Sequence, residues 1–329
     1  MEQKKVRWGI LGTAQIGMTQ LIPGLLLADN AELYGIAGRK PEKIKVFDEM
    51  FHPKKTYLGY DAMLEDPDID AVYIPLNNAL HCEWTVKALN KKKHVLCEKP
   101  MACNLKEVLE MQKAADDNGV YVAEAFAYLH SPYVKRLRDI VQGGMIGDLL
   151  FMTSWFSIDL LRNDPDNCRF WDEPGAGGVY DLGCYPLSLI RFVTGKDPVR
   201  ATADGKIGSN NVELTTNTLF QFDGDFYASM FCSMEARQTN GYRIVGTKGQ
   251  IDGLDYAFNS MGKLPIKAMV EGKDIVEWVN APHNYMLEVE QLGRCILDGE
   301  KPWVDYEFTR KNVDILDNIV KQVFRQNGK

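Results

Sequence analysis

The sequence predicts a two-domain α/β protein, in which a doubly wound parallel sheet is followed by an α+β domain with a large, mostly antiparallel sheet. Its 329 residues are too many for one ordinary hydrophobic core. Over residues 1–125, short apolar strands alternate with amphipathic helices, which is typical of a parallel sheet covered by helices. Over residues 126–329, longer strands of alternating apolar and polar residues favour an antiparallel sheet. We therefore expect two domains, at 1–125 and 126–329.

The composition is that of an ordinary globular protein, with 45% hydrophobic and 25% charged residues. A net charge of -7 disfavours a nucleic-acid partner, and no apolar run is long enough to span a membrane. The first residues run into a strand without a secretory signal. The 7 cysteines are scattered without metal-ligand spacing, so we expect buried free thiols, no metal site and a cytoplasmic location.

The first strand is expected at residues 5–11, and an apolar helical run is expected at 18–28. Pro23 lies inside this run and is expected to kink it or to mark its first turns. Between strand and helix, residues 12–17 have the pattern G-x-A-x-x-G, one substitution away from the fingerprint of dinucleotide-binding sites. The alternative interpretation is a glycine turn with a purely structural role.

Three small residues in this turn have separate expected roles. Gly12 allows the tight turn, Ala14 keeps the backbone fairly close to a pyrophosphate, and Gly17 lets the helix pack on the strand. The N-terminus of the helix then offers free N–H groups to phosphate. The expected phosphate-binding residues are Gly12, Thr13, Ala14, Gln15, Ile16 and Gly17.

The end of the second strand, at residues 32–37, indicates which dinucleotide binds. The fingerprint predicts a carboxylate there, about 20 residues after the glycines, to bind the ribose 2′-OH. Arg39 and Lys40 stand at this place instead. Two cations suit a 2′-phosphate, so the sequence favours NADP over NAD. The alternative is a solvated basic start to the helix expected at 41–50.

The remaining elements of the first domain continue the alternation, and Gly119 fits the position just after a helix. Helices are expected at 60–65, 81–90 and 104–118, and strands at 71–75 and 120–124 with another leading into residue 98.

The second domain is expected to have an antiparallel sheet half covered by helices. Its strands are expected at 149–157, 215–222, 226–233 and 242–245, and its helices at 133–141, 284–297 and 308–326.

The stretch at residues 95–100 is an apolar, β-branched run that ends in Glu98-Lys99-Pro100. It reads as a buried strand that stops at a functional turn. A lysine just past the carboxyl end of a strand lies where open α/β sheets bind their ligands. The alternative is a surface lysine before a turn.

A glycine-rich segment at 175–178 leads into Asp181 and Tyr185, which are four residues apart and share a face if the segment is helical. A phenol beside a lysine ammonium has its ionised form favoured, so its pKa falls towards the working pH. Such a phenol can remove the proton of an alcohol as hydride leaves. The alternative is a glycine loop with one buried hydrogen bond between tyrosine and aspartate.

With these motifs the chain resembles the glucose–fructose oxidoreductase, inositol dehydrogenase and MocA (Gfo/Idh/MocA) family along nearly its whole length. The matching segments are 12–17, 98–100, 177–185 and a turn at 245–249. The resemblance implies an N-terminal Rossmann domain and a C-terminal domain with a large, mostly antiparallel sheet. It also implies NAD(P)-dependent oxidation or reduction of sugars, polyols or related carbonyls. Lys99 is implied to lie beside the nicotinamide, commonly with a cis bond before Pro100.

Many family members carry histidine at the position of Tyr185. The Tyr185-Pro186-Leu187 form is similar to dimeric dihydrodiol dehydrogenases and NADP-dependent D-xylose dehydrogenases. In that branch the tyrosine is the acid/base, which implies this role for Tyr185 with Lys99 and Asp181 as supports. The resemblance further implies cofactor contacts by Glu98 and Lys99, and pairing through the second sheet into a homodimer or homotetramer. Ala14 and Ala176 depart from the family pattern without affecting the fold.

The sequence thus predicts an NADP-dependent oxidoreductase that transfers hydride between the nicotinamide and a small, sugar-like alcohol or carbonyl. Lys99 comes from the first domain, so it meets Asp181 and Tyr185 only if the active site lies between the domains. If Tyr185 were not the acid/base, His81 and His130 would be the next candidates. The alternative function is a non-catalytic, NADP-binding sensor or regulatory protein on the same fold.

Substrate contacts are expected from the loop at 161–174. Arg162, Arg169 and Trp171 lie in this loop. They are candidates for holding hydroxyls, for stacking on a sugar, or for a subunit interface.

Overall fold

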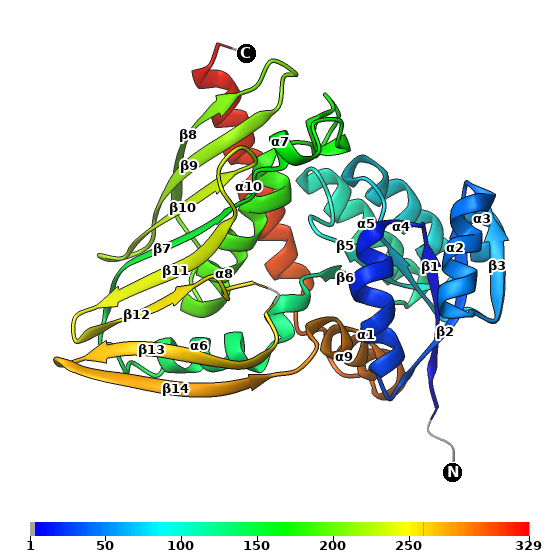
Figure 1. Ribbon diagram of the computed structural model, residues 1–329, viewed down its shortest axis with the longest axis horizontal. Coiled ribbons are helices and arrows are strands. Elements are labelled where there is room, and N and C mark those ends of the chain that lie inside the picture. Colours follow the sequence, from blue (N-terminus) through cyan, green and yellow to red (C-terminus); the bar gives the residue numbers. More distant parts are fainter. Residues whose placement is uncertain (1–3, 259, 329) are drawn as a thin grey trace. The chain divides into compact units, whose positions relative to one another are not determined.

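The computed structural model describes residues 4–258 and 260–328 (Figure 1). By its contacts the chain divides into two compact units: Met1–Ala127 with His283–Val313, and Tyr128–Pro282 with Asp314–Lys329. We call these the first and second units and describe each by itself. The division predicted at 125/126 had assigned residues 283–313 to the second domain, whereas their contacts are with the first unit.

Within the described residues, the first unit contains a six-stranded parallel sheet with the order β3-β2-β1-β4-β5-β6. Its strands are β1 Val6–Leu11, β2 Ala31–Gly38, β3 Lys55–Leu58, β4 Ala71–Ile74, β5 His94–Glu98 and β6 Val122–Ala125. The order runs outwards in both directions from β1 and β4, which makes the sheet doubly wound and confirms the predicted Rossmann architecture. Strand β3 was not predicted, because it is short and its side chains are mostly exposed.

The helices of the first unit begin and end close to where the sequence predicts. They are α1 Ile22–Leu27, α2 Pro41–Phe51, α3 Tyr60–Leu64, α4 His81–Asn90, α5 Leu105–Asn118 and α9 Asn284–Asp298. A π-helical turn, Gly17–Leu21, precedes α1, and Pro23 lies in the first turn of α1. Asn104 caps α5 by accepting the N–H of Glu107 at 3.1 Å, and Gly119 ends it with a φ of 63°.

Helix α9 explains why residues 283–313 belong to the first unit. Val289 and Leu292 are buried in the same core as α1 and the sheet, and each such burial stabilises the fold by about 1.5–3 kcal/mol. At Gly24 of α1, a Cβ would lie 2.7 Å from the backbone nitrogen of Met286, so only glycine lets the two helices approach this closely. The side-chain amide of Asn30 also donates to the carbonyl of Glu290 at 2.9 Å. These contacts join segments that are about 260 residues apart in the chain.

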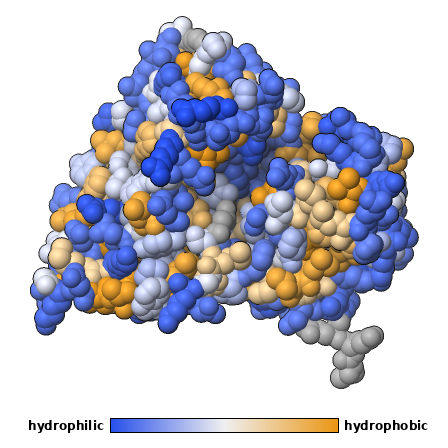
Figure 2. All heavy atoms as spheres, in the orientation of Figure 1, coloured by the Kyte–Doolittle hydropathy of each residue, from blue (hydrophilic) through white to orange (hydrophobic). Residues whose placement is uncertain are grey.

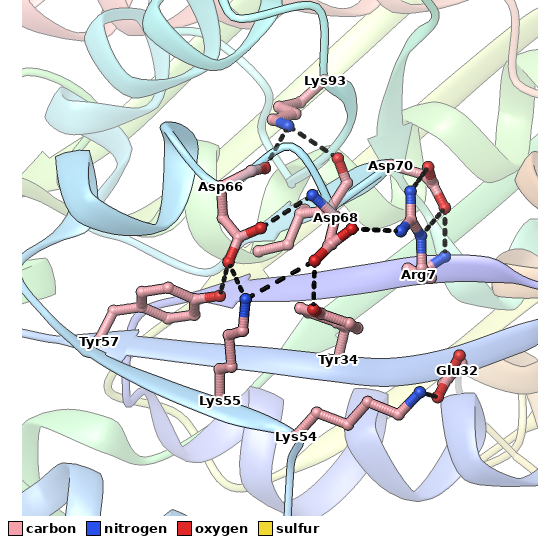
Figure 3. Close-up of polar contacts among 11 residues, drawn as sticks. Arg7, Glu32, Tyr34, Lys54, Lys55, Tyr57, Asp66, Asp68, Asp70 and Lys93 are labelled. Atoms are coloured by element: carbon pink, nitrogen blue, oxygen red, sulfur yellow. Dashed lines mark hydrogen bonds and ion pairs between the residues drawn. The ribbon is translucent and has the colours of Figure 1, made fainter.

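A charged network joins the amino ends of the strands in the first unit (Figure 3). The guanidinium of Arg7 in β1 binds Asp70 at 2.8 Å and Asp68 at 3.0 Å, in the loop before β4. Lys55 of β3 binds Asp66 of the same loop at 2.8 Å. The carboxyl ends of the strands, where ligands bind in such sheets, lie at the opposite edge.

Within the described residues, the second unit contains an eight-stranded sheet with the order β14-β13-β12-β11-β7-β10-β9-β8. Of its described pairings only β7 with β10 is parallel, which confirms a mostly antiparallel sheet. The strands are β7 Leu149–Ser157, β8 Arg200–Ile207, β9 Glu213–Gln221, β10 Tyr227–Ser233, β11 Thr239–Gly246, β12 Gly249–Leu254, β13 Gly262–Val270 and β14 Lys273–Ala281.

One face of this sheet is covered by helices α6 Pro132–Gln142 and α8 Cys184–Thr194 and by the C-terminal half of α10 Tyr306–Gln326 (Figure 1). The other face carries exposed apolar side chains, with Leu219 52%, Val276 52% and Trp278 56% exposed. Figure 2 shows apolar residues among polar ones on the surface over β13 and β14. Pairing through this sheet into a homodimer or homotetramer would need such a face. The oligomeric state stays a prediction.

Three further observations bear on the class of protein. No helix in the described part of the chain is both long and apolar enough to cross a membrane. Among residues 4–258 and 260–328, no three His, Cys, Asp or Glu side chains are grouped so as to hold a metal ion. All 7 cysteines are free thiols; five are buried, as predicted, and Cys82 and Cys168 are half-buried.

The glycine-rich segment of the second unit is clamped to the sheet by Glu213, the first residue of β9. The carboxyl of Glu213 is 1% exposed and accepts the N–H of Val179 at 2.9 Å. Gly177 has a φ of +93°, and a Cβ built on it would overlap that carboxyl. Burial raises the pKa of Glu213 to about 7. Glycine is therefore required at 177 both by its backbone conformation and by the close approach of the carboxyl.

Because the pKa of Glu213 is raised in the folded state, we expect the free energy of unfolding to depend on pH. Its folded-state pKa lies above the unfolded value, so the stability it contributes is lost as pH rises through about 7. Glu213→Gln keeps an acceptor for Val179 but cannot ionise. We expect the variant to match the native protein near pH 5 and to be more stable near pH 8 by up to about 3 kcal/mol, measured by urea denaturation. Glu110→Gln, which changes an exposed carboxyl, serves as control. If the free energy of unfolding of Glu213→Gln differs from that of the native protein by the same amount at both pH values, the raised pKa of Glu213 is contradicted.

Candidate active site

The turn after β1 lies at the edge of the first sheet where the carboxyl ends of the strands meet. Gly12 has a φ of +144°, and a Cβ there would press on the side chain of Leu76 at 3.2 Å, so the turn needs glycine. Helical geometry begins at Gln15. The N–H groups of the first helical turn have no acceptor within the helix and therefore suit a phosphate. The phosphate-binding role of residues 12–17 stays a prediction.

The role predicted for Gly17 is not required by the packing. A Cβ at Gly17 would contact Ile10 and Tyr73 at 3.8 Å, which is ordinary van der Waals distance. The close approach is found at Gly38 instead, where a Cβ would lie 2.7 Å from Ile44 and 3.1 Å from Thr13. Glycine at the end of β2 thus lets the two turns at this edge lie against each other.

Arg39 and Lys40 follow β2 and are both exposed. Strands β1 and β2 pair with Leu11 opposite Ala37, so these two cations come directly beside the Gly12 turn. The guanidinium carbon of Arg39 lies 6.0 Å from the ring centre of Tyr60. The arrangement provides positive charge next to the turn that is predicted to bind phosphate, without the carboxylate that a free ribose 2′-OH would need.

The turn after β5 holds Glu98 and Lys99, which are both half-buried, and the bond between Lys99 and Pro100 is cis as the resemblance implied. The hydroxyl of the buried Tyr73 in β4 donates to Glu98. The N–H of Lys99 donates to the other oxygen of the same carboxylate at 3.2 Å. The neighbouring strand therefore fixes the carboxylate that precedes Lys99.

His81, one of the two reserve candidates for the acid/base, instead joins two backbone turns. It is fully buried, with Nδ1 2.9 Å from the carbonyl of Pro100 and Nε2 2.9 Å from the carbonyl of Leu76. Burial lowers its pKa although both contacts raise it, and the neutral ring can donate to only one of the two carbonyls at a time. His81 thus lies between the turn after β5 and the turn after β4 and donates to one of them. The other candidate, His130, is also buried.

In the second unit, Asp181 lies in a π-helical turn, Val179–Gly183, and Tyr185 lies in the first turn of α8. The half-buried ring of Tyr185 packs against Phe156 and Phe258, with ring centres 5.3 and 5.2 Å apart. Tyr128 donates a hydrogen bond to the carbonyl of Tyr185 at 3.1 Å. These contacts fix the direction of the phenol relative to its helix.

The carboxylate of Asp181 binds Nε of Arg169 at 2.7 Å. Sequence reasoning had placed Arg169 among residues for the substrate or an interface, and had missed this ion pair. Arg162 is exposed and pairs with Asp159 at 3.2 Å, and Trp171 is 47% exposed. Lys99 belongs to the first unit and Asp181 and Tyr185 to the second, so the predicted meeting of the three side chains stays a prediction.

Comparison with known proteins places these two units in a family. Residues 6–126 match a family model described as "Oxidoreductase family, NAD-binding Rossmann fold", and residues 134–252 match the "GFO/IDH/MocA C-terminal domain". The chain is 33% identical to a D-xylose 1-dehydrogenase (NADP(+)) of Haloferax volcanii, covering 95% of both chains. It is 28% identical to a trans-1,2-dihydrobenzene-1,2-diol dehydrogenase of Xenopus laevis, covering 96% of this chain and 98% of that one.

Among solved structures, a 3-ketoreductase from Actinomadura kijaniata, in complex with NADP and TDP-benzene, superposes with a TM-score of 0.88. The two chains are 25% identical, and the match covers 97% of this chain and 98% of the other. The two family models match residues 6–126 and 134–252, and these relatives match nearly the full length of the chain. The chain therefore belongs to the Gfo/Idh/MocA family of oxidoreductases.

Proposed function

We propose that this protein is an NADP-dependent oxidoreductase that transfers hydride between the nicotinamide and the carbinol or carbonyl carbon of a small, sugar-like substrate. The observation that carries the proposal is the phenol of Tyr185, which packs against the rings of Phe156 and Phe258 four residues after an ion-paired aspartate. A phenol held in this way is suited to moving a proton at one defined position.

Features of the first unit support NADP as the cofactor. The Gly12 turn and the start of the following helix would hold the pyrophosphate, and Arg39 with Lys40 would bind the 2′-phosphate. Bound there, the cofactor would supply or accept the hydride. Two of the relatives named above are described with NADP, which agrees with this choice.

We propose that Tyr185 gives its proton to the substrate oxygen during reduction and takes it back during oxidation. Lys99, from the first unit, would add positive charge beside the phenol and the reacting oxygen, which stabilises negative charge on either. The fixed turn around Glu98 would set the position of Lys99. The names of the relatives, a xylose dehydrogenase, a diol dehydrogenase and a 3-ketoreductase, support a polyhydroxylated alcohol or its carbonyl as substrate class.

A non-catalytic NADP-binding sensor on the same fold is the second candidate. It would bind the cofactor at the same edge of the first sheet, but it would have no use for Lys99, Asp181 and Tyr185 together. Turnover of any member of a panel of aldoses, polyols, diols and dicarbonyls distinguishes the two candidates.

The first prediction from this proposal concerns cofactor choice. We expect NADPH to bind the native protein more tightly than NADH, because Arg39 and Lys40 offer charge-assisted hydrogen bonds to the 2′-phosphate. Arg39→Ala should weaken NADPH binding about tenfold to a hundredfold, or about 1.5–3 kcal/mol, and leave NADH binding unchanged. Titration calorimetry with both cofactors measures this. Lys43→Ala, which removes an exposed cation on α2, is the control. Equal affinities of the native protein for both cofactors would refute the proposal.

The second prediction concerns the proton. Tyr185→Phe keeps the aromatic packing but removes the transferable proton, so kcat should fall by about 10²–10⁴ while NADPH affinity barely changes. Lys99→Ala should also lower kcat and should move the pH profile upwards, because it removes charge that favours the phenolate. Tyr227→Phe, an exposed tyrosine on β10, is the matched control. Near-native turnover by Tyr185→Phe with a good substrate would show that another group moves the proton.

A further inference from the structure

A cavity lies at the amino ends of the strands of the first unit, at the sheet edge opposite to the Gly12 turn. It has a volume of about 310 Å³ and is lined by the segments that precede β1, β4 and β5 and by the end of α9. All of these segments belong to the first unit. A cavity of this size is large enough for a small ligand.

Five lysines line this cavity. Lys4 and Lys5 precede β1, and Lys91, Lys92 and Lys93 form the turn from α4 to β5. The N–H groups of all three turn residues donate to carbonyls in the last turns of α4, so the backbone that carries these lysines is fixed. The chain as a whole has a net charge of -7, and the cavity therefore stands out as a concentration of positive charge in an acidic protein.

Lys93 is the buried member of this group. It is 6% exposed, and its ammonium donates to the carbonyls of Asp66 at 2.6 Å and Ile69 at 2.8 Å (Figure 3). An ammonium has three donors, so one N–H of Lys93 has no acceptor among the described residues. Burial lowers the pKa of this lysine, because neutral carbonyls compensate its charge only in part.

The charged side chains that face this ammonium are bound to one another or to other cations (Figure 3). The guanidinium of Arg7 binds Asp70 at 2.8 Å and Asp68 at 3.0 Å. The carboxylate of Asp66 binds the ammonium of Lys55 at 2.8 Å. In the part of the chain that the structure describes, none of these carboxylates forms an ion pair with a lysine of the cavity.

The exposed lysines of the cavity also keep most of their charge uncompensated. Lys91 pairs with Glu65 at 2.5 Å. Within residues 4–258 and 260–328, Lys4, Lys5 and Lys92 have no carboxylate partner, and all three are exposed. The cavity thus brings together several ammonium groups that no carboxylate of the described chain neutralises.

The remaining wall of the cavity is mostly apolar and includes Val6, Pro67, Ile69, Ile296 and Leu297. Two titratable groups complete it. Burial lowers the pKa of His94 to about 4, so its ring is neutral near pH 7, and Asp70 is bound to Arg7. Positive charge beside an apolar wall suits an anion that also carries an apolar group.

We propose that this cavity binds a small organic diphosphate, with its phosphates on Lys5, Lys92 and Lys93 and its apolar group against Ile296 and Leu297. A diphosphate offers enough charge and enough acceptor oxygens for several ammonium groups, including the unused N–H of Lys93. The site lies at the opposite edge of the sheet from the turn that is proposed to hold the cofactor, and it does not depend on the proposed function.

Titration calorimetry with two probes, inorganic pyrophosphate and isopentenyl diphosphate, tests this proposal. Saturating NADPH is present throughout, so that the Gly12 turn is occupied. Both probes should bind, and the apolar chain should tighten binding about tenfold, because it leaves water for the apolar wall. Both affinities should fall as salt is added.

Lysine variants assign the binding to this cavity. Lys5→Gln and Lys92→Gln should each weaken both probes about threefold to tenfold, and the double variant should weaken them by about the product. Lys93→Met should remove binding. If Lys93→Met does not fold, the double variant decides the question, because it changes only exposed side chains. Lys267→Gln, which removes an exposed lysine of β13 in the second unit, is the matched control and should have no effect.

Three results would overturn the proposal. Displacement of pyrophosphate by NADPH, with native affinity in the double variant, would place the probe at the Gly12 turn. Equal losses in Lys267→Gln and Lys92→Gln would mean general attraction to lysines. Equal affinity for the two probes would exclude an organic ligand. Failure of the proposed function would show instead as a lack of NADPH binding or of turnover, and the lysine variants would then be titrated without NADPH.

Discussion

The close approach of Gly177 to the buried carboxyl of Glu213 is the contact on which the second half of the candidate site depends. It fixes the backbone just before the π-helical turn that carries Asp181, and that turn leads directly into the helix that carries Tyr185. A Cβ at 177 would lie 2.2 Å from an oxygen of this carboxyl, so either the carboxyl or the segment would have to shift. The glycine at 177 is therefore explained by a carboxyl located 36 residues further along the chain.

In the first unit, hydrogen bonds likewise fix a turn that carries a candidate residue, at the carboxyl end of β5. The hydroxyl of Tyr73 donates to Glu98 in the turn that carries Lys99, and the ring of His81 lies 2.9 Å from the carbonyl of Pro100. All of these groups are partly or fully buried, so their hydrogen bonds do not compete with water. The turn at Gly12, which is proposed to bind the nucleotide, lies on the same edge, two strands away through β4. The candidate residues of this unit are thus concentrated where parallel strands end.

The parts of the fold that have strong local signals could be predicted from the sequence. Strand β1, the Gly12 turn and helix α4 follow from hydrophobic periodicity and from glycine positions, and the structure has them where expected. Strands β13 and β14 were missed, because many of their side chains are exposed on both faces and Pro265 interrupts the pattern. The return of α9 to the first unit depends on contacts with α1, which no local pattern reports.

The same limit applies to the candidate site. Lys99, Asp181 and Tyr185 were found from short motifs and a family resemblance, which report residue types but not their partners. The ion pair of Arg169, the clamp at Glu213 and the contact of His81 with Pro100 each join residues that are 12 to 36 positions apart. Spacing of that size carries no periodic signal. The ring environment of Tyr185 likewise comes from three separate segments of the chain.

The proposed passage of hydride between the nicotinamide and a substrate carbon is tested most directly with NADPH that carries deuterium at one or the other face of C4. This cofactor is supplied together with the best carbonyl substrate of the panel. If hydride passes directly, one of the two labelled cofactors transfers its deuterium to the new carbinol carbon, as read by mass spectrometry and NMR. Product without label from either cofactor, or bound NADPH that is never oxidised by any carbonyl of the panel, would contradict it.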